Sequence, residues 1–326
     1  MEIQDQFMTH NGLRKSHVNN PAVCTYSRGL EHISATNPAL VLLHGYPQSA
    51  YIWRHMIPLL PKSAPLFIPD LPGYGNSEAP TAHDKLSVGL AVLSALHSVL
   101  KEQSENSSKD DTIPVMLIGH DRGARIAHRL GVSGAPDIRI LGVTLIDIVP
   151  TSTQWAGAGN PHENAGFFHW PFLANVELAT KMITAYGGDK FCVDMIGRWV
   201  GNTPKGLARM KEGDSYKVYA DSFLRESVIR ATCQDYEAGA GVDVDVQKED
   251  QKAGRKLQVP VLLIYGAEHI GRRFDVKKEW IDWVGEGVKI TDRGLGDGIG
   301  HFAAEEAPEE TTEAILSWQK SLLKSS

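Results

Sequence analysis

The sequence predicts an α/β fold, a mostly parallel central sheet flanked by helices with a helical segment inserted into it. Short apolar runs that end at glycine or polar turn residues alternate with stretches of helical spacing. Such continuous apolar runs are typical of parallel strands, because helices bury both faces of the sheet. The predicted strands are residues 39–44, 65–70, 114–119, 138–147 and 259–266, with a weaker one at 288–290.

Residues 151–256 break this alternation, since they are rich in aromatics and helix-like stretches and lack buried-strand runs. We expect a helical cap domain there, over the carboxyl ends of the strands, and a core domain from residues 1–150 and 257–326. In the core, apolar spacing predicts helices at residues 86–100 and 308–323. The polar run 101–111 between strand signals predicts an exposed loop.

Composition narrows the class of protein. The 326 residues are 42% hydrophobic and 22% charged, which is typical of a soluble globular chain. A net charge of −6 argues against nucleic acid or an anionic membrane as a partner. The first ten residues lack a secretory pattern, and no apolar run approaches the ~20 residues that span a bilayer. Cys24, Cys192 and Cys233 have no metal-ligand spacing, so we expect buried thiols in a cytoplasmic protein without metal or cofactor.

Residues 119–123 (GHDRG) follow the apolar run 115–118 and carry the most specific signal in the chain. A strand, a sharp turn with small residues and then a helix are typical of the nucleophile elbow of α/β-hydrolases. Here Asp121 occupies the tip, where most of these enzymes have serine. A carboxylate is suited to displacing a leaving group from saturated carbon, which leaves an ester for water to break. The elbow therefore predicts hydrolysis of a carbon–halogen bond or an epoxide.

A base and an acid complete this chemistry. In this fold the order along the chain is nucleophile, acid, histidine. His301 lies between glycines after the last strand signal, and we expect it to activate the hydrolytic water. The acid has two candidates, Asp147 at the end of strand 138–147 and Glu268 in the loop after strand 259–266.

Backbone and side-chain donors are predicted around the nucleophile. The N–H groups of Tyr46, in the segment 44–47 (HGYP), and of Arg122 are the candidates for an oxyanion hole. The guanidinium groups of Arg122 and Arg125 lie just after Asp121 and are suited to binding a substrate carboxylate. Structural ion pairs are the alternative role for either arginine.

Together these motifs resemble the fluoroacetate (haloacetate) dehalogenases among the epoxide hydrolase-like α/β-hydrolases. The elbow, the segment 145–151 (LIDIVPT) and the cap segments 167–172 (FFHWPF) and 233–239 (CQDYEAG) carry the resemblance. It implies that Asp147 is the acid and that the chain forms a homodimer. It also implies that His169, Trp170 and Tyr236 bind the departing halide; spacing alone would make Trp170 and Tyr236 packing residues.

The resulting hypothesis is a hydrolase that releases halide from small 2-haloacids through an aspartyl ester. One alternative is an epoxide hydrolase, in which Tyr236 and one of Tyr186, Tyr216 or Tyr219 protonate the opening ring. Another is a catalytically silent protein that senses a ligand in the same pocket. The glycine-rich stretch 154–166 is expected to shape the pocket entrance.

Overall fold

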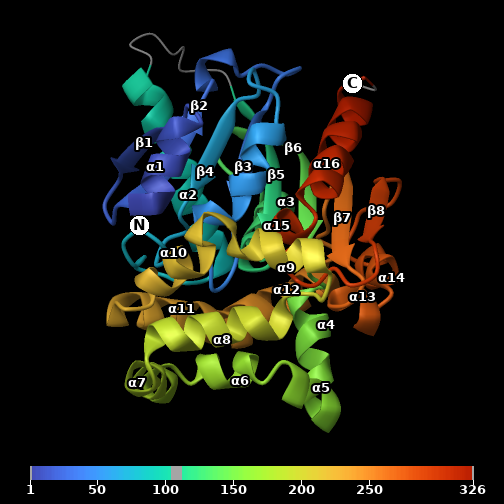
Figure 1. The fold of residues 1–326 in the computed structure, drawn as a ribbon. Coiled ribbons are helices and arrows are strands. Elements are labelled where there is room, and N and C mark those ends of the chain that lie inside the picture. Colours follow the sequence, from blue (N-terminus) through green and yellow to red (C-terminus); the bar gives the residue numbers. More distant parts are fainter. Residues whose placement is uncertain (1, 104–111, 325–326) are drawn as a thin grey trace.

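The computed structural model describes residues 2–103 and 112–324. An eight-stranded sheet in the order β1-β2-β4-β3-β5-β6-β7-β8 runs through the core (Figure 1). The six strands from β4 to β8 in this order are parallel, and β2 and β1 extend one edge antiparallel. The strands are β1 Arg14–Val18, β2 Val23–Arg28, β3 Ala39–Leu43, β4 Leu66–Pro69, β5 Ile113–His120, β6 Ile138–Ile146, β7 Val261–Gly266 and β8 Ile290–Leu295.

The mostly parallel sheet flanked by helices is confirmed. The five apolar runs form β3 to β7, and β8 begins at the last residue of the weaker predicted strand. Strands β1 and β2 have no counterpart in the predicted set. Their sequences, RKSHV and VCTYSR, mix polar and apolar residues as an antiparallel edge does, so they lack an apolar run.

Alternate residues of each strand point into two hydrophobic cores, one on each face of the sheet. Helices α2, α3 and α14 cover one face, where Val41 and Leu43 of β3 are buried. Helices α1 and α16 with the short turn η2 cover the other, where Leu40 and Leu42 are buried. The helices and 3₁₀ turns of the core are α1 Glu2–His10, η1 Leu30–His32, η2 Ala50–His55, η3 Ile57–Leu59, α2 Lys85–Gln103, α3 Arg122–Ser133, α13 Ile270–Arg273, α14 Val276–Ile281, α15 Ala303–Glu306 and α16 Pro308–Leu323.

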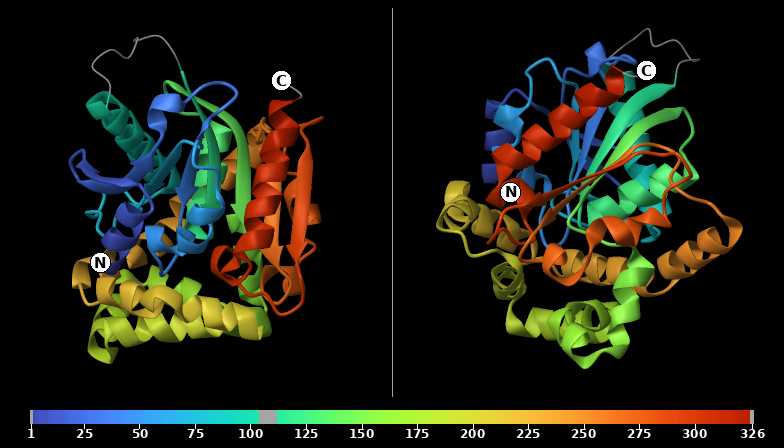
Figure 2. Two further views of the ribbon diagram at one scale, coloured as in Figure 1. Left: turned by 45° about the horizontal axis from the view of Figure 1, so that its top comes forward. Right: turned by 90° about the vertical axis from the view of Figure 1, so that its right-hand side faces the viewer.

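Helices α4 to α12, here called the helical layer, lie together beneath the end of the sheet where β5 and β6 finish (Figures 1 and 2). The chain enters this layer directly after β6, which ends at Ile146. The elements are α4 Thr151–Ala156, η4 Gly157–Gly159, α5 Pro161–Gly166, α6 His169–Ala174, α7 Val176–Tyr186, α8 Gly188–Trp199, α9 Pro204–Lys211, η5 Glu212–Asp214, α10 Ser215–Ser222, α11 Glu226–Ala240 and α12 Val242–Ala253.

Three smaller expectations have different outcomes. The predicted loop 101–111 begins inside α2, which continues to Gln103, and residues 104–111 lie outside the described residues. The three cysteines are buried and unpaired, as predicted. Among the described helices, none combines the length and the apolar character needed to cross a bilayer.

Candidate active site

The predicted elbow is a tight turn between β5 and α3. Asp121 has φ +46° and ψ −114°, a region that non-glycine residues rarely adopt. Glycine is required on both sides of it. A Cβ at Gly119 would lie 2.4 Å from the carbonyl oxygen of Gly123, and one at Gly123 would lie 2.2 Å from that of Leu43. The turn therefore holds the Asp121 side chain at the edge of the sheet that faces the helical layer.

The Asp121 carboxylate is buried but ionised. Its Oδ2 accepts the backbone N–H of Tyr46 at 3.0 Å, and Gly45 lets this loop approach, because a Cβ there would be 2.5 Å from Asp121 Cβ. Burial raises the pKa of Asp121, but the charges of His301 and Arg122 outweigh it and the net shift is downward. Within the described residues we find no bond from the N–H of Arg122 to this carboxylate.

Asp147 lies directly after β6 and joins two imidazoles. Its Oδ2 accepts Nδ1–H of His301 and of His269, each at 2.6 Å, and its Oδ1 accepts the N–H of Gly266 at 3.0 Å. Burial alone would raise the pKa of Asp147. The charge of His269 and the hydrogen bonds from both imidazoles outweigh this effect, so the net shift of the pKa is downward. Glu268, the other candidate acid, lies 3.7 Å from exposed Arg272 instead. This geometry favours Asp147 as the acid.

The His301 ring is fixed through its backbone as well as its side chain. Its N–H donates to the carbonyl of Trp199 at 2.8 Å, and its own carbonyl accepts Nε2–H of His120 at 2.8 Å. Because Nδ1 donates to Asp147, Nε2 is left with a lone pair for a proton. Burial lowers the pKa of His301, but the hydrogen bond and charge of Asp147 and the charge of Asp121 raise it overall.

Glu306 of α15 connects the loop of His301 with the helical layer. Its Oε2 accepts the N–H groups of Gly300 at 2.9 Å and of Gly201 at 2.8 Å, and its Oε1 accepts that of Phe302 at 3.0 Å. Gly201 follows α8, whereas the other two residues flank His301. One buried carboxylate therefore holds both sides of the predicted base and the layer above it.

The two arginines of the elbow helix have different surroundings. Arg122 donates through Nε and Nη2 to the carboxylate and carbonyl of Asp235, each at 2.6 Å, so it forms the structural ion pair named above as the alternative. Its Nη1 is buried without a partner among the described residues. Arg125 lines the cavity beside Asp121. Burial and the Arg122 charge lower the pKa of Arg125 to about 10, so it stays protonated at neutral pH.

His169 and Trp170 of α6 and Tyr236 of α11 line the same cavity from the helical layer. The centre of the His169 ring lies 4.5 Å from the centre of the Trp199 ring and 5.7 Å from that of the Tyr236 ring. Burial lowers the pKa of His169 well below its ordinary value, so the ring is neutral at pH 7. His169 Nδ1 is buried and has no hydrogen-bond partner among the described residues.

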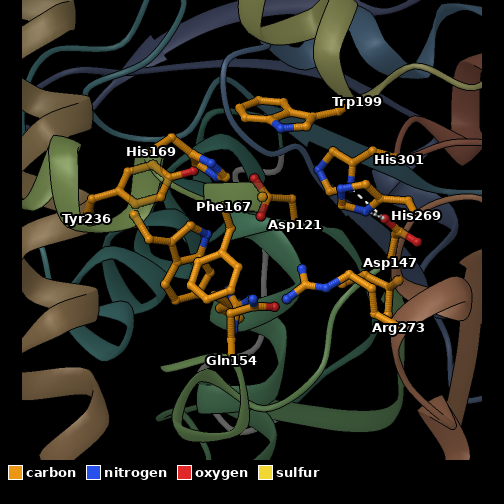
Figure 3. A pocket seen from close by; sticks show the side chains of 14 residues that line it. Asp121, Asp147, Gln154, Phe167, His169, Trp199, Tyr236, His269, Arg273 and His301 are labelled. Atoms are coloured by element: carbon orange, nitrogen blue, oxygen red, sulfur yellow. Dashed lines mark hydrogen bonds and ion pairs between the residues drawn. The ribbon is translucent and has the colours of Figure 1, made fainter. Parts of the chain in front are cut away.

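These groups surround a cavity of about 50 Å³. Figure 3 shows the Asp121 carboxylate between the His169–Tyr236 side and the pair of histidines on Asp147. A cavity of this size suits a small substrate rather than a drug-sized ligand. Its lining residues are Asp121, Arg125, Asp147, Gln154, Gly166, Phe167, His169, Trp170, Trp199, Tyr236, His269, Ile270, Arg273 and His301.

Seven lining residues received no individual role in the sequence analysis: Gln154, Gly166, Phe167, Trp199, His269, Ile270 and Arg273. The first three lie in or beside the stretch 154–166, which was expected to shape the pocket entrance. His269 follows β7 in the loop where the acid was sought, so its position gave a signal. Trp199 at the end of α8 and the two residues of the short helix α13 belong to no motif.

Asp147, His269 and His301 are the one group in the described chain with ligand atoms close enough to hold a metal ion. The same Nδ1 atoms make the hydrogen bonds to Asp147 Oδ2. A metal bound to them would replace the protons that orient His301. The donor set therefore suits a catalytic triad better than a resident metal.

Comparison with known proteins identifies the family. A model of the alpha/beta hydrolase family matches residues 40–314. The chain belongs to this family. A fluoroacetate dehalogenase from a Burkholderia species is 25% identical over 284 residues, covering 87% of each chain. The soluble epoxide hydrolase of Corynebacterium sp. strain C12 is 29% identical over 293 residues, covering 86% of this chain and 89% of the relative.

A solved structure gives the same answer for the fold. A candidate epoxide hydrolase from Pseudomonas aeruginosa superposes with a TM-score of 0.80 at 25% identity, covering 96% of this chain and 98% of the other. The α/β-hydrolase fold and the resemblance to fluoroacetate dehalogenases and epoxide hydrolases are thus confirmed. The protein is a hydrolase of this family.

Proposed function

We propose that this hydrolase removes halide from short 2-haloacids, such as haloacetates, through an ester on Asp121. The observation that carries the proposal is the Arg125 guanidinium in the same small cavity as the ionised Asp121 carboxylate. A cation beside the nucleophile is suited to a substrate carboxylate, which haloacids have and simple epoxides lack.

In the first step, an oxygen of Asp121 attacks the α-carbon opposite the halogen. The new C–O bond forms as the halide leaves with the C–X electron pair, so the α-carbon is inverted. His169, Trp170 and Tyr236 offer one N–H or O–H each to the departing halide. Fluoride in particular needs such donors, because it is a poor leaving group without them.

In the second step, His301 Nε2 takes a proton from water, and the oxygen of that water attacks the carboxyl carbon of the Asp121 ester. The Tyr46 N–H, which already contacts Oδ2, stabilises the charge on the carbonyl oxygen. Collapse breaks the bond between the carboxyl carbon and the substrate oxygen, which takes the proton from His301 and leaves as the hydroxyl of the 2-hydroxy acid. Loss of the remaining proton restores the Asp121 carboxylate. Esterification removes the Asp121 charge that helps to raise the pKa of His301, which favours the free-base form of His301 in this step.

We also propose that the helical layer is the cap of this site, since it supplies the halide donors and Gln154. A 2-haloacid is then the only partner that the chemistry requires, and the homodimer implied by the resemblance remains a prediction.

Epoxide hydrolysis is the second candidate because the soluble epoxide hydrolase relative covers as much of the chain. It needs acids that protonate the opening ring, and Tyr236 is the one tyrosine lining the described cavity. Tyr186 is 56% exposed and bonds to Asp194, and Tyr219 bonds to buried Glu305. These contacts favour the haloacid proposal.

The test measures halide release from fluoroacetate and chloroacetate beside diol formation from styrene oxide. We expect halide from both acids, little diol, and no halide release by Asp121→Asn. Diol without halide would move the chain to the epoxide hydrolases. Unchanged halide release by Asp121→Asn would contradict the ester mechanism.

A further inference from the structure

Gln154 of α4 and Arg273 of α13 are polar side chains on the cavity wall that have no part in the reaction above. Gln154 is 3% exposed, and its Nε2 has no hydrogen-bond partner in the described parts of the chain. A buried amide donor without a partner destabilises the folded protein until an acceptor binds to it. Figure 3 shows both side chains across the cavity from Trp199, with their polar ends pointing toward one another.

The Arg273 guanidinium is held at the rim of the cavity with donors to spare. Its Nη2 pairs with Glu163 of α5. Its guanidinium lies 4.9 Å from the centre of the Phe167 ring and 5.2 Å from that of Phe274. Within the described residues, Nε and Nη1 donate to no acceptor. These contacts fix the plane of the guanidinium and leave one side of it for an anion.

This position is separate from that of Arg125. Arg125 donates to the carbonyl of Val149 at 3.1 Å and to the hydroxyl of Thr151 at 2.8 Å, and lies 4.6 Å from the Trp170 ring. Arg273 comes from another element and contacts other aromatic rings. The cavity therefore presents two guanidinium groups that share no partner, although a haloacetate has a single carboxylate.

We propose that Arg273 and Gln154 form a second anion subsite, so that the preferred substrates are short 2-haloacids with a second carboxylate, of the 2-halosuccinate kind. This rests on the proposed function. Arg125 binds the carboxylate next to the halogen-bearing carbon. Arg273 and the Gln154 amide donate to the distal carboxylate at the rim. The bonds that break and form are those of the haloacetate reaction.

The test compares kcat/KM for halide release from 2-chlorosuccinate and 2-chlorobutyrate, which share a four-carbon chain and differ in the distal carboxylate. We expect the wild type to prefer 2-chlorosuccinate by at least about tenfold, the value of one charge-assisted hydrogen bond. Arg273→Met is expected to remove most of this preference and Gln154→Leu part of it. Arg272→Met is the matched control, since Arg272 is exposed and does not line the cavity.

The outcomes separate the two proposals. Halide release from chloroacetate and 2-chlorobutyrate without a preference for 2-chlorosuccinate would overturn the subsite and leave the dehalogenase. Equal losses on both C4 acids in Arg273→Met would also overturn it. No halide from any acid would overturn the proposed function itself. If Arg273→Met does not fold, inhibition of halide release by the wild type is measured instead. The subsite predicts that succinate inhibits at least about tenfold more tightly than butyrate, and equal inhibition by the two acids would refute it.

Discussion

The two sides of the cavity differ in how their polar groups are satisfied. On the sheet side, Asp121, Asp147 and His301 all hydrogen-bond to protein groups. On the layer side, His169 Nδ1 and Gln154 Nε2 are buried without partners among the described residues. The sheet side is therefore organised before any ligand arrives.

This contrast indicates which side of the cavity determines substrate selectivity. Groups that must act on one fixed carboxylate are preorganised by backbone and side-chain bonds, which avoids reorganisation during the reaction. Unpartnered donors are destabilising alone, so they contribute only when a ligand accepts their hydrogen bonds. We infer that the sheet side sets the reaction type and binds the acid through Arg125 and Arg273 of the core helices, whereas the layer side sets the leaving group and adds Gln154 to the second subsite.

The largest effect is expected from replacing His301, which should stop ester hydrolysis while the first release of halide continues. For His301→Gln we expect turnover to fall about 10³-fold or more, because general-base assistance is lost while Asp121 can still attack. The variant should release one halide per active site and then stop, with a covalent adduct visible by mass spectrometry. Steady turnover without adduct would contradict a role limited to the second step.

Matched variants at Asp147 and Glu268 test which of the two acids orients His301. Asp147→Asn is expected to lower turnover about 10³-fold, because the amide no longer holds His301 in the required tautomer. Glu268→Gln should change turnover less than twofold, since Glu268 contacts exposed Arg272. Thermal melting of both variants checks folding. A larger loss in Glu268→Gln would reverse the assignment.

The predicted halide donors of the helical layer are tested by comparing substrates with different leaving groups. Tyr236→Phe is expected to slow fluoroacetate about 10–100-fold, since one donor to the departing halide is removed. Bromoacetate should be slowed less, because bromide leaves more easily and needs less help. Tyr186→Phe, at an exposed tyrosine of the layer, is the control. Equal slowing of both substrates would argue for a packing role.

The pH dependence sharpens the contrast between the two steps. Asp121 has a lowered pKa, so it stays ionised and the burst of halide should persist well into acid solution. His301 must be neutral to take a proton from water, so steady turnover should fall about tenfold per pH unit below the pKa of His301 in the ester form. Asp147 raises that pKa in both forms, whereas the Asp121 charge raises it only in the free enzyme. Rapid-quench assays measure the burst of halide, and steady-state assays measure turnover. If the burst and turnover declined at the same pH, a single group would control both steps.

Local signals were enough to predict the fold and the tight turn that carries Asp121. Apolar runs predict β3 to β7, and the glycines around Asp121 meet a steric need that the structure confirms. The pairing of Arg122 with Asp235 spans 113 residues, and no local pattern encodes which of two arginines is neutralised. The same holds for Gln154 and Arg273, which meet at the cavity only through packing of the helical layer on the sheet.

The three hydrogen bonds of Glu306 make the position of His301 depend on the helical layer. The carboxylate that holds Gly300 and Phe302 also holds Gly201 beyond α8. Lifting that part of the helical layer would break this bond and the one from His301 N–H to Trp199. The position of the predicted base therefore depends on the packing of α8 against the loop of His301. In the proposed mechanism, displacing α8 would leave the Asp121 ester without the group that activates water.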